Sequence, residues 1–321
     1  MNPVSLTRSK RPASVAFAFS LVVFMLLIPR ARAQEKSDPR ASILVSTSWL
    51  AKHLNDPDLV LLHVGEKKEY DKGHIAGARF ATLDDISVSE HDKPGGLMLQ
   101  MPTNEVLRKD LATLGISDKS KVVVYYGGEW VSPATRVVFT LDYAGLGART
   151  VLLDGGLQAW TSEGRPTSNV VPPSRNGSLS ELKTRPIVVD AEWVKSHVGK
   201  PGISVVDGRA AAFYDGVQTG MGMHAAQRTG HVAGAKSVPF TEVTDDKLKL
   251  RSREELAAIF LKAGVQPGDT VVGYCHVGQQ ATAMLFAARS LGHPVLLYDG
   301  SYEDWSAHAD YPVDNPSAKV K

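Results

Sequence analysis

The sequence has very little cysteine, since Cys275 is the only one among 321 residues. A single cysteine excludes a disulfide framework within the chain and any zinc site built from several thiolates. Charge of one sign is also not in excess, because 36 Lys and Arg stand against 34 Asp and Glu, and nothing in that balance suggests a nucleic-acid partner. The 28 Gly and 18 Pro fall short of the content of collagen-like or disordered chains. We therefore expect packed cores, in a chain long enough for two domains.

The first 33 residues have the pattern of a secretory signal peptide. Three basic residues precede an apolar run over 13–28, and Ala-Arg-Ala at 31–33 is a small-x-small cleavage site. The apolar run is shorter than the roughly 20 residues that a membrane-spanning helix needs. Removal of this segment takes away five basic residues and leaves 31 against 34, a net charge of −3. We expect an exported protein, periplasmic or secreted, without a stable membrane anchor after cleavage.

The rest of the chain repeats itself once. Gly-His-Ile-Ala-Gly-Ala at 73–78 returns as Gly-His-Val-Ala-Gly-Ala at 230–235, and each copy follows a short apolar run. A period of about 150 residues is far too long for a solenoid and indicates a duplicated domain. We predict one domain over 41–168 and a second over 186–316. The segment 169–185 between them has the Pro, Ser, Asn and Gly content of a linker.

Within each copy, apolar β-branched runs alternate with helical patterns. In the second copy, apolar residues at helical spacing over 256–261 and 283–288 are followed by strand-like runs at 270–274 and 295–298. This alternation predicts an α/β fold, in which a mostly parallel sheet carries helices on both faces. In such a sheet the chemistry belongs at the carboxyl ends of the strands.

Cys275 lies at such a strand end. It directly follows the run 270–274 and precedes a helical pattern that begins near Ala281. Residues 275–280 would then form a strand-to-helix loop whose main-chain N–H groups converge, an arrangement that favours a negative charge and hence a thiolate. Gly278 is placed to take a positive φ in the bend. A lone cysteine is more often buried and inert, but its place at a strand end favours a nucleophile.

Several motifs agree in order and spacing. They are the loop Cys-His-Val-Gly-Gln-Gln-Ala at 275–281, the paired segments 73–78 and 230–235, Asp207-Gly208-Arg209, and Tyr298-Asp299-Gly300-Ser301. Together they resemble a tandem-domain rhodanese of the thiosulfate sulfurtransferase family, from about residue 41 to 316. The resemblance implies two rhodanese-like α/β domains with the active site in the second. It implies that the loop cysteine takes the outer sulfur of a donor as a persulfide and passes it to cyanide or a thiol, with no separate cofactor and no metal.

The resemblance also implies roles for single residues. Cys275 would be the nucleophile, Arg209 would bind the donor, and Asp207 would hold the loop or that arginine in place. The cradle for the persulfide and the anionic donor would be the main chain of His276, Val277, Gly278, Gln279 and Gln280.

Two departures bear on the donor. His276 and Val277 occupy the loop positions where thiosulfate-specific members tend to carry cations, and Phe213 stands where related enzymes often have a second arginine. A planar carboxylate is best held bidentately by arginine. We therefore expect thiosulfate as the donor, with 3-mercaptopyruvate as the alternative.

The first copy departs further from the family pattern. Tyr126 stands where the cysteine is expected, His63 where Asp207 falls, and Gly65 where Arg209 falls. The loop that follows, 127–133, is also longer. We expect this domain to be catalytically silent and to cover one side of the active cleft.

The remaining conspicuous side chains are histidines and methionines. The repeated His74 and His231 are predicted to make structural hydrogen bonds rather than to act as bases. For His276 two interpretations stay open, a positive charge for the donor or an exposed side chain. The soft ligands that copper(I) prefers occur together at 221–224, but a flexible insertion is favoured there; they are Met221, Met223 and His224. We expect a monomer that acts on small molecules and binds no nucleic acid.

Three other functions are considered. A phosphatase would need an arginine that closes the cysteine loop, where the chain has Ala281 and Thr282. A non-enzymatic binding module is disfavoured because the second copy has kept its cysteine. A thiol redox protein is disfavoured because there is no second cysteine.

Overall fold

The computed structural model describes Met1 and residues 38–90, 92–220 and 226–320. The predicted signal peptide therefore lies outside the described residues except for Met1, and so do Met221, Met223 and His224.

The first copy forms a five-stranded sheet in the order β1-β5-β4-β2-β3, in which every neighbouring pair is parallel. Its elements in chain order are β1 (Leu44–Val45), α1 (Thr47–His53), β2 (Leu59–Val64), α2 (Lys67–Lys72), β3 (Arg79–Ala81), α3 (Asn104–Thr113), β4 (Lys121–Tyr126), α4 (Ser132–Tyr143), η1 (Gly147–Arg149), β5 (Thr150–Leu153) and α5 (Gly156–Ser162).

The second copy repeats this topology as β6-β11-β10-β7-β9, again with parallel neighbours, and adds the antiparallel pair β12-β8. Its elements are β6 (Val188–Val189), α6 (Ala191–His197), β7 (Ile203–Asp207), α7 (Ala211–Tyr214), β8 (His231–Val232), β9 (Lys236–Ser237), η2 (Phe240–Glu242), α8 (Arg253–Lys262), β10 (Thr270–Tyr274), α9 (Gln280–Ser290), β11 (Val295–Tyr298), α10 (Ser301–Ala307), β12 (Val313–Asp314) and η3 (Pro316–Val320). The predicted α/β fold with two domains of one topology is confirmed.

Helices cover both faces of each sheet. Successive strand side chains point to opposite faces, so both sets of side chains are buried. In β4, Val123 packs with Leu50 of α1 and Trp160 of α5, whereas Val124 joins the core that includes Leu107 of α3. This alternation explains why the strands read as continuous apolar runs in the sequence.

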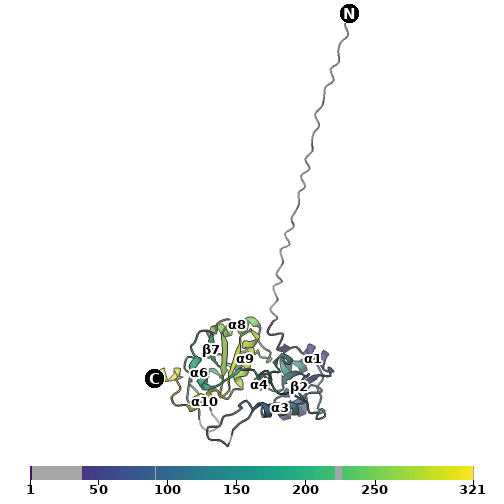
Figure 1. Cartoon of the computed structure of the whole chain (residues 1–321), viewed down its shortest axis with the longest axis horizontal. Coiled ribbons are helices and arrows are strands. Elements are labelled where there is room, and N and C mark those ends of the chain that lie inside the picture. Colours follow the sequence, from purple (N-terminus) through teal and green to yellow (C-terminus); the bar gives the residue numbers. More distant parts are fainter. Residues whose placement is uncertain (2–37, 91, 221–225, 321) are drawn as a thin grey trace. The chain divides into compact units, whose positions relative to one another are not determined.

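The two domains share one apolar core, to which α4 and α9 contribute from either side. These helices lie side by side (Figure 1), and the hydroxyl groups of Thr135 on α4 and Thr282 on α9 are 2.9 Å apart and hydrogen-bonded. Each helix follows a strand through a short loop, α4 after β4 and α9 after β10. The packing of α4 on α9 therefore brings the first domain close to the loop that contains Cys275.

The segment 169–185 contains no helix or strand, but it packs on the first domain. Leu179 and Leu182 are buried, and the Ser180 hydroxyl donates to Asp118 Oδ2 over 2.7 Å. Arg185 Nη1 pairs with Asp142 near the end of α4. The second half of this connection, 177–185, is thus held on the first domain.

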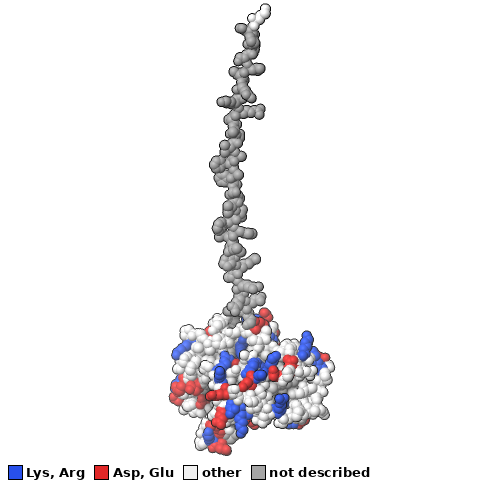
Figure 2. Space-filling model, turned by 45° about the vertical axis from the view of Figure 1, so that its right-hand side comes forward, with Lys and Arg blue, Asp and Glu red and all other residues white. Residues whose placement is uncertain are grey.

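Charged side chains of both signs lie interspersed on the face shown in Figure 2. Among the described helices, none has the length and apolar character needed to cross a membrane. Within the same residues, no three His, Cys, Asp or Glu side chains come together as a metal site.

Candidate active site

Cys275 lies one residue beyond the end of β10, at the carboxyl edge of the second sheet. Its N–H donates to the Ser301 hydroxyl over 3.2 Å, and its carbonyl accepts from the Tyr302 N–H over 2.9 Å. The loops after β10 and β11 are therefore bound to each other at this point. The cysteine side chain is fully buried.

The loop between β10 and α9 turns at Gly278, whose φ of +80° confirms the predicted positive value. Four main-chain N–H groups of this loop donate to no described residue, namely those of His276, Val277, Gly278 and Gln279. Free N–H groups at the start of an 11-residue helix form a site that favours a negative charge. The loop can therefore hold an anionic sulfur group beside Cys275.

Ser301 is the second unusual backbone position at the site, because it has a φ of +53° although it is not glycine. Its hydroxyl donates to the Tyr298 carbonyl over 3.0 Å and accepts from Cys275 N–H. The residue is fully buried. Such a left-handed backbone costs free energy and is kept where the surroundings fix it, often at functional sites.

Asp207 and Arg209 form a buried ion pair at the end of the neighbouring strand β7. Arg209 Nη2 lies 2.6 Å from Asp207 Oδ2, and Nε donates to the same carboxylate over 3.0 Å. Nη2 also donates to the Gly230 carbonyl over 2.7 Å, and the guanidinium lies 4.0 Å from the centre of the Tyr302 ring. Arg209 is only 1% exposed, and Nη1 is its one nitrogen atom that donates to no described residue. Only Nη1 is therefore left to bind a sulfur-donor substrate.

The structure gives His276 neither of the two roles that the sequence left open. Burial, and after it the charge of Arg209, lowers the pKa of His276 to about 4, so the ring is neutral near pH 7. Its Nδ1 donates to Gln227 Oε1 over 3.0 Å, and Phe213 lies edge-on against it at 4.6 Å between ring centres. His276 thus supplies no positive charge and does not point freely into solvent.

The side chains of Val277, Gln279 and Gln280 differ in their surroundings. The Gln279 side chain turns toward the first domain, where its Nε2 donates to the Ser132 hydroxyl over 3.2 Å. Gln280 Oε1 is buried and accepts no hydrogen bond from a described residue. Val277 is partly exposed. The structure therefore places the main chain of 276–279 in the loop beside Cys275, with Gln280 at the start of α9, and the Gln279 side chain contacts the first domain.

Arg136 of α4 is a contributor that sequence reasoning missed. It is fully buried, its Nη1 donates to the Gly278 carbonyl over 3.1 Å, and the same atom lies 2.9 Å from Asp299 Oδ1. Nη2 donates to the Leu99 carbonyl. The only signal in the sequence was an arginine inside the apolar pattern of the helix at 132–143.

A second segment of the first domain, 98–101, binds the residues that follow β11. The N–H groups of Met98 and Met101 donate to Glu303 Oε2 over 2.9 Å and to Asp299 Oδ2 over 2.7 Å. Both carboxylates belong to the loop and helix that follow β11. The first domain thus contacts the cysteine loop through Arg136 and its supporting loop through the segment 98–101.

The two domains correspond residue by residue at the strand ends. The register pairs His63 with Tyr125 in the first sheet and Asp207 with Tyr274 in the second. Both tyrosine hydroxyls accept a main-chain N–H from the repeated Gly-His segments, Tyr125 from Ile75 over 3.0 Å and Tyr274 from Val232 over 3.1 Å. The residue after each tyrosine is therefore equivalent, which places Tyr126 where the second domain has Cys275.

The repeated histidines have the predicted structural role. His74 Nδ1 donates to the Tyr70 carbonyl over 2.9 Å, and His231 Nδ1 donates to the Tyr214 carbonyl over 2.7 Å. Each ring also stacks on the tyrosine whose carbonyl it binds. Both are buried.

Comparisons with known proteins agree with this architecture. The Rhodanese-like domain family matches residues 46–163 and again 190–308. The chain is 29% identical over 276 residues to thiosulfate sulfurtransferase of Azotobacter vinelandii, covering 85% of this chain and 97% of that protein. It is also 29% identical over 285 residues to 3-mercaptopyruvate sulfurtransferase of Escherichia coli strain K12, covering 84% and 97%.

Among solved structures, wild-type EanB has the same fold with a TM-score of 0.76 at 22% identity, over 87% of this chain and 70% of that one. Two matches to one domain family, with two sheets of one topology, cover most of the chain. The chain therefore belongs to the rhodanese family, as a tandem-domain member whose relatives include sulfurtransferases.

Proposed function

We propose that the protein is a sulfurtransferase in which Cys275 carries the sulfur. The Cys275 thiolate attacks the outer sulfur of thiosulfate, the S–S bond of the donor breaks, and sulfite leaves with the electron pair. The resulting persulfide is then attacked at its outer sulfur by cyanide or a thiolate. That step forms thiocyanate or an acceptor persulfide and regenerates the Cys275 thiolate. No oxidant is consumed in either step.

The observation that supports this proposal best is the group of four free N–H donors over 276–279 beside Cys275. Both the thiolate and the persulfide are anionic, and main-chain N–H groups stabilise them without a proton-transfer partner. The neighbouring histidine is neutral near pH 7, so it adds no charge. A phosphatase is not supported, because Ala281 and Thr282 at the start of α9 offer no cation to clamp a phosphoryl group.

Thiosulfate is the donor that we propose, ahead of 3-mercaptopyruvate. Phe213 carries no charge, and His276, on which it packs, is neutral near pH 7. Neither residue therefore offers the second cation that a planar carboxylate would need. Arg209 keeps only Nη1 free, so it cannot grip a carboxylate with two nitrogen atoms while it pairs with Asp207. A compact dianion can instead be held by the loop N–H groups together with one guanidinium edge.

Further parts of the proposal come from the sequence. We propose that the protein uses no cofactor beyond the persulfide, acts as a monomer on small molecules, and works after export to the periplasm or outside the cell. We also propose that the first domain, which has Tyr126 in place of the nucleophile, is catalytically silent.

Mass spectrometry of the protein after incubation with thiosulfate tests the reaction class. We expect a one-sulfur mass increase in the peptide that contains Cys275, and its loss after addition of cyanide. Cys275→Ser is expected to abolish turnover while it keeps the fold, because the loop conformation depends on Gly278 and on main-chain contacts. Turnover by a folded Cys275→Ser protein would exclude this nucleophile.

Steady-state assays with both donors test the substrate. We expect the larger kcat/KM with thiosulfate, together with a high KM, since few groups hold the donor. A larger kcat/KM with 3-mercaptopyruvate would reverse the choice of donor and leave Cys275 as the nucleophile.

A further inference from the structure

A cleft of about 810 Å³ opens at the carboxyl edge of the first sheet. Its floor consists of Val64 at the end of β2, Gly65 directly after it, and Gly127 and Gly128 after β4. This is the place that corresponds to the Cys275 site of the second domain. Gly65 is equivalent to Arg209 by the strand register, so no guanidinium fills the space here.

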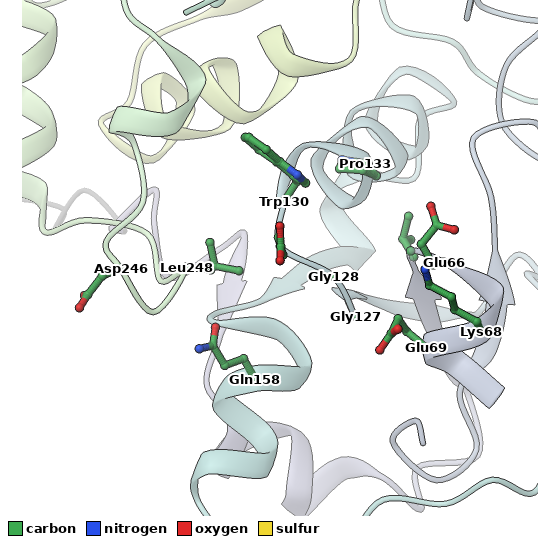
Figure 3. Close-up of a pocket in the computed structure, with 13 residues that line it drawn as sticks. Glu66, Lys68, Glu69, Gly127, Gly128, Trp130, Pro133, Gln158, Asp246 and Leu248 are labelled. Carbon is green, nitrogen blue, oxygen red and sulfur yellow. The ribbon is translucent and has the colours of Figure 1, made fainter. Parts of the chain in front are cut away.

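The walls of this first-domain cleft are acidic. Glu66, Glu69, Glu129 and Asp246 line it against a single cation, Lys68, which gives the side chains a net charge of −3. Figure 3 shows Glu66, Lys68 and Glu69 on one side of the cleft and Trp130 across from them. Glu69 pairs with Lys72 over 3.1 Å. The other three carboxylates make no ion pair or hydrogen bond with any described residue. The cleft therefore repels the anions that suit the second domain and attracts cations.

Trp130 gives the cleft an aromatic wall. It is 52% exposed, although large aromatic side chains usually bury more of their surface. One part of its ring system packs on Phe240 of η2, with 5.2 Å between ring centres. The remaining ring surface lies at the cleft. An exposed indole beside carboxylates is the combination that holds organic ammonium groups in proteins.

A buried polar group without a partner lies behind the cleft floor. His63 is fully buried, and its Nδ1 lies 3.1 Å from the Tyr125 hydroxyl, which accepts the Ile75 N–H and has no other described group to receive its own proton, so we assign Nδ1 as the acceptor. The ring proton is then on Nε2, which donates to no described residue. A Cβ added at Gly65 would lie 3.5 Å from Nε2, and one added at Gly127 would lie 2.3 Å from it. Nε2 thus lies against the backbone of the two floor glycines, and a hydroxyl or carbonyl of a ligand that reaches the space beside Gly65 would satisfy it.

We propose that the first-domain cleft binds a small organic cation, an ammonium compound that also carries a hydroxyl or carbonyl group. The ammonium group lies between Trp130 and the carboxylates of Glu66 and Glu129, and the acceptor faces the glycine floor. The cleft is then a ligand site at the position that corresponds to the Cys275 site of the second domain. This inference does not depend on sulfur transfer by Cys275.

Calorimetric titration of the full chain with matched probes tests the site. Choline and propylammonium are the cationic probes, and 3,3-dimethylbutan-1-ol is the neutral isostere of choline. We expect choline to bind at least about tenfold more tightly than the neutral alcohol, and more weakly as salt is raised. The Cys275→Ser protein is expected to bind choline unchanged, which separates this site from the proposed nucleophile.

Two variants locate the binding. Trp130→Ala and the double variant Glu66→Gln/Glu129→Gln are each expected to weaken choline at least about fivefold. The control Glu105→Gln/Glu254→Gln removes two exposed carboxylates on α3 and α8 and is expected to leave binding unchanged. All of these positions are exposed, so the fold is expected to tolerate the changes.

Three results would overturn the proposal. The first is that neither cationic probe binds at about 10 mM. The second is equal binding of choline and 3,3-dimethylbutan-1-ol, which would show an apolar pocket that does not recognise charge. The third is choline binding that survives both Trp130→Ala and the double glutamine variant, which would place the site elsewhere.

Discussion

Arg136 of the first domain donates from Nη1 to the carbonyl of Gly278, 3.1 Å away in the loop that follows Cys275. The two residues are 142 positions apart in the chain. The same nitrogen atom pairs with Asp299, which is 6% exposed, so one buried guanidinium holds two loops of the second domain together. The first domain therefore supports the geometry of the proposed active site although it supplies no nucleophile to it.

Arg136→Lys is expected to lower kcat about tenfold while the protein stays folded. Lysine keeps the charge beside Asp299, but a single ammonium cannot reach Asp299, Gly278 and Leu99 at once as the planar guanidinium does. Thiosulfate:cyanide assays and urea unfolding measure the two effects. Arg185→Lys is the control, because this half-exposed arginine pairs with Asp142, away from the cysteine loop. A kcat that matches that of the control would show that the loop keeps its conformation without Arg136.

Gly278→Ala is expected to lose more activity and stability than Gly268→Ala. Both glycines have a left-handed φ, +80° and +90°, so both variants carry a backbone cost of about 1 kcal/mol. A Cβ at Gly278 would also lie 3.0 Å from Arg136 Nη1 and 3.0 Å from the Asp299 carbonyl, whereas one at Gly268 meets nothing within 4 Å. The difference between the variants in urea unfolding and in kcat isolates this contact. Equal losses would contradict it.

Arg209→Lys is expected to raise the KM for thiosulfate with a smaller effect on stability than Arg209→Ala. The alanine variant leaves Asp207 buried without its partner, which costs about 3 to 5 kcal/mol. The lysine variant keeps that charge pair but has no second nitrogen atom for the donor. Steady-state kinetics and urea unfolding of both variants separate the two roles. An unchanged KM in a folded Arg209→Lys protein would mean that Arg209 only neutralises Asp207.

Stability is expected to fall as the pH is lowered from 6.5 toward 4, in part because of His63. Burial, and after it His74, lowers the pKa of His63 in the folded protein to about 4 from the usual 6.5. Between these values the unfolded chain binds a proton that the folded chain excludes, so the stabilisation is present above pH 6.5 and is lost below it. Between pH 6.5 and 5 the loss from His63 is about 1.6 kcal/mol, since the unfolded histidine is already half protonated at pH 6.5. Urea unfolding at both pH values checks this.

His63→Phe should reduce that pH dependence by the part that His63 contributes, because the replacement ring does not titrate, whereas the buried His276 keeps its own contribution. A slope that is the same in the variant and in the unaltered protein would assign the acid sensitivity to other groups.

Tyr126→Cys in a Cys275→Ser chain is not expected to take up sulfur from thiosulfate. The new thiol would stand at the position equivalent to the nucleophile, but His63 and Gly65 replace the aspartate and arginine there, and the cleft walls are acidic. The Tyr126 hydroxyl donates to the Leu248 carbonyl over 2.6 Å, so the fold of the variant needs a check by urea unfolding. A one-sulfur mass increase at residue 126 would show that the first domain has kept a working cradle.

The sequence by itself determined the duplicated α/β architecture and the place of the cysteine. Both follow from local signals, because the alternation of apolar runs with helical patterns sets the strands and helices, and a glycine such as Gly278 sets the turn after β10. The repeated Gly-His segments were likewise readable, since each histidine binds a carbonyl in its own domain.

Only the tertiary structure decided how these residues are surrounded. It buried Arg209 against Asp207, lowered the pKa of His276, and brought Arg136 to Gly278. It also placed a charged cleft at the edge of the first sheet that corresponds to the Cys275 site. Desolvation and contacts across more than a hundred residues depend on which elements pack together, and no local pattern along the chain records that packing.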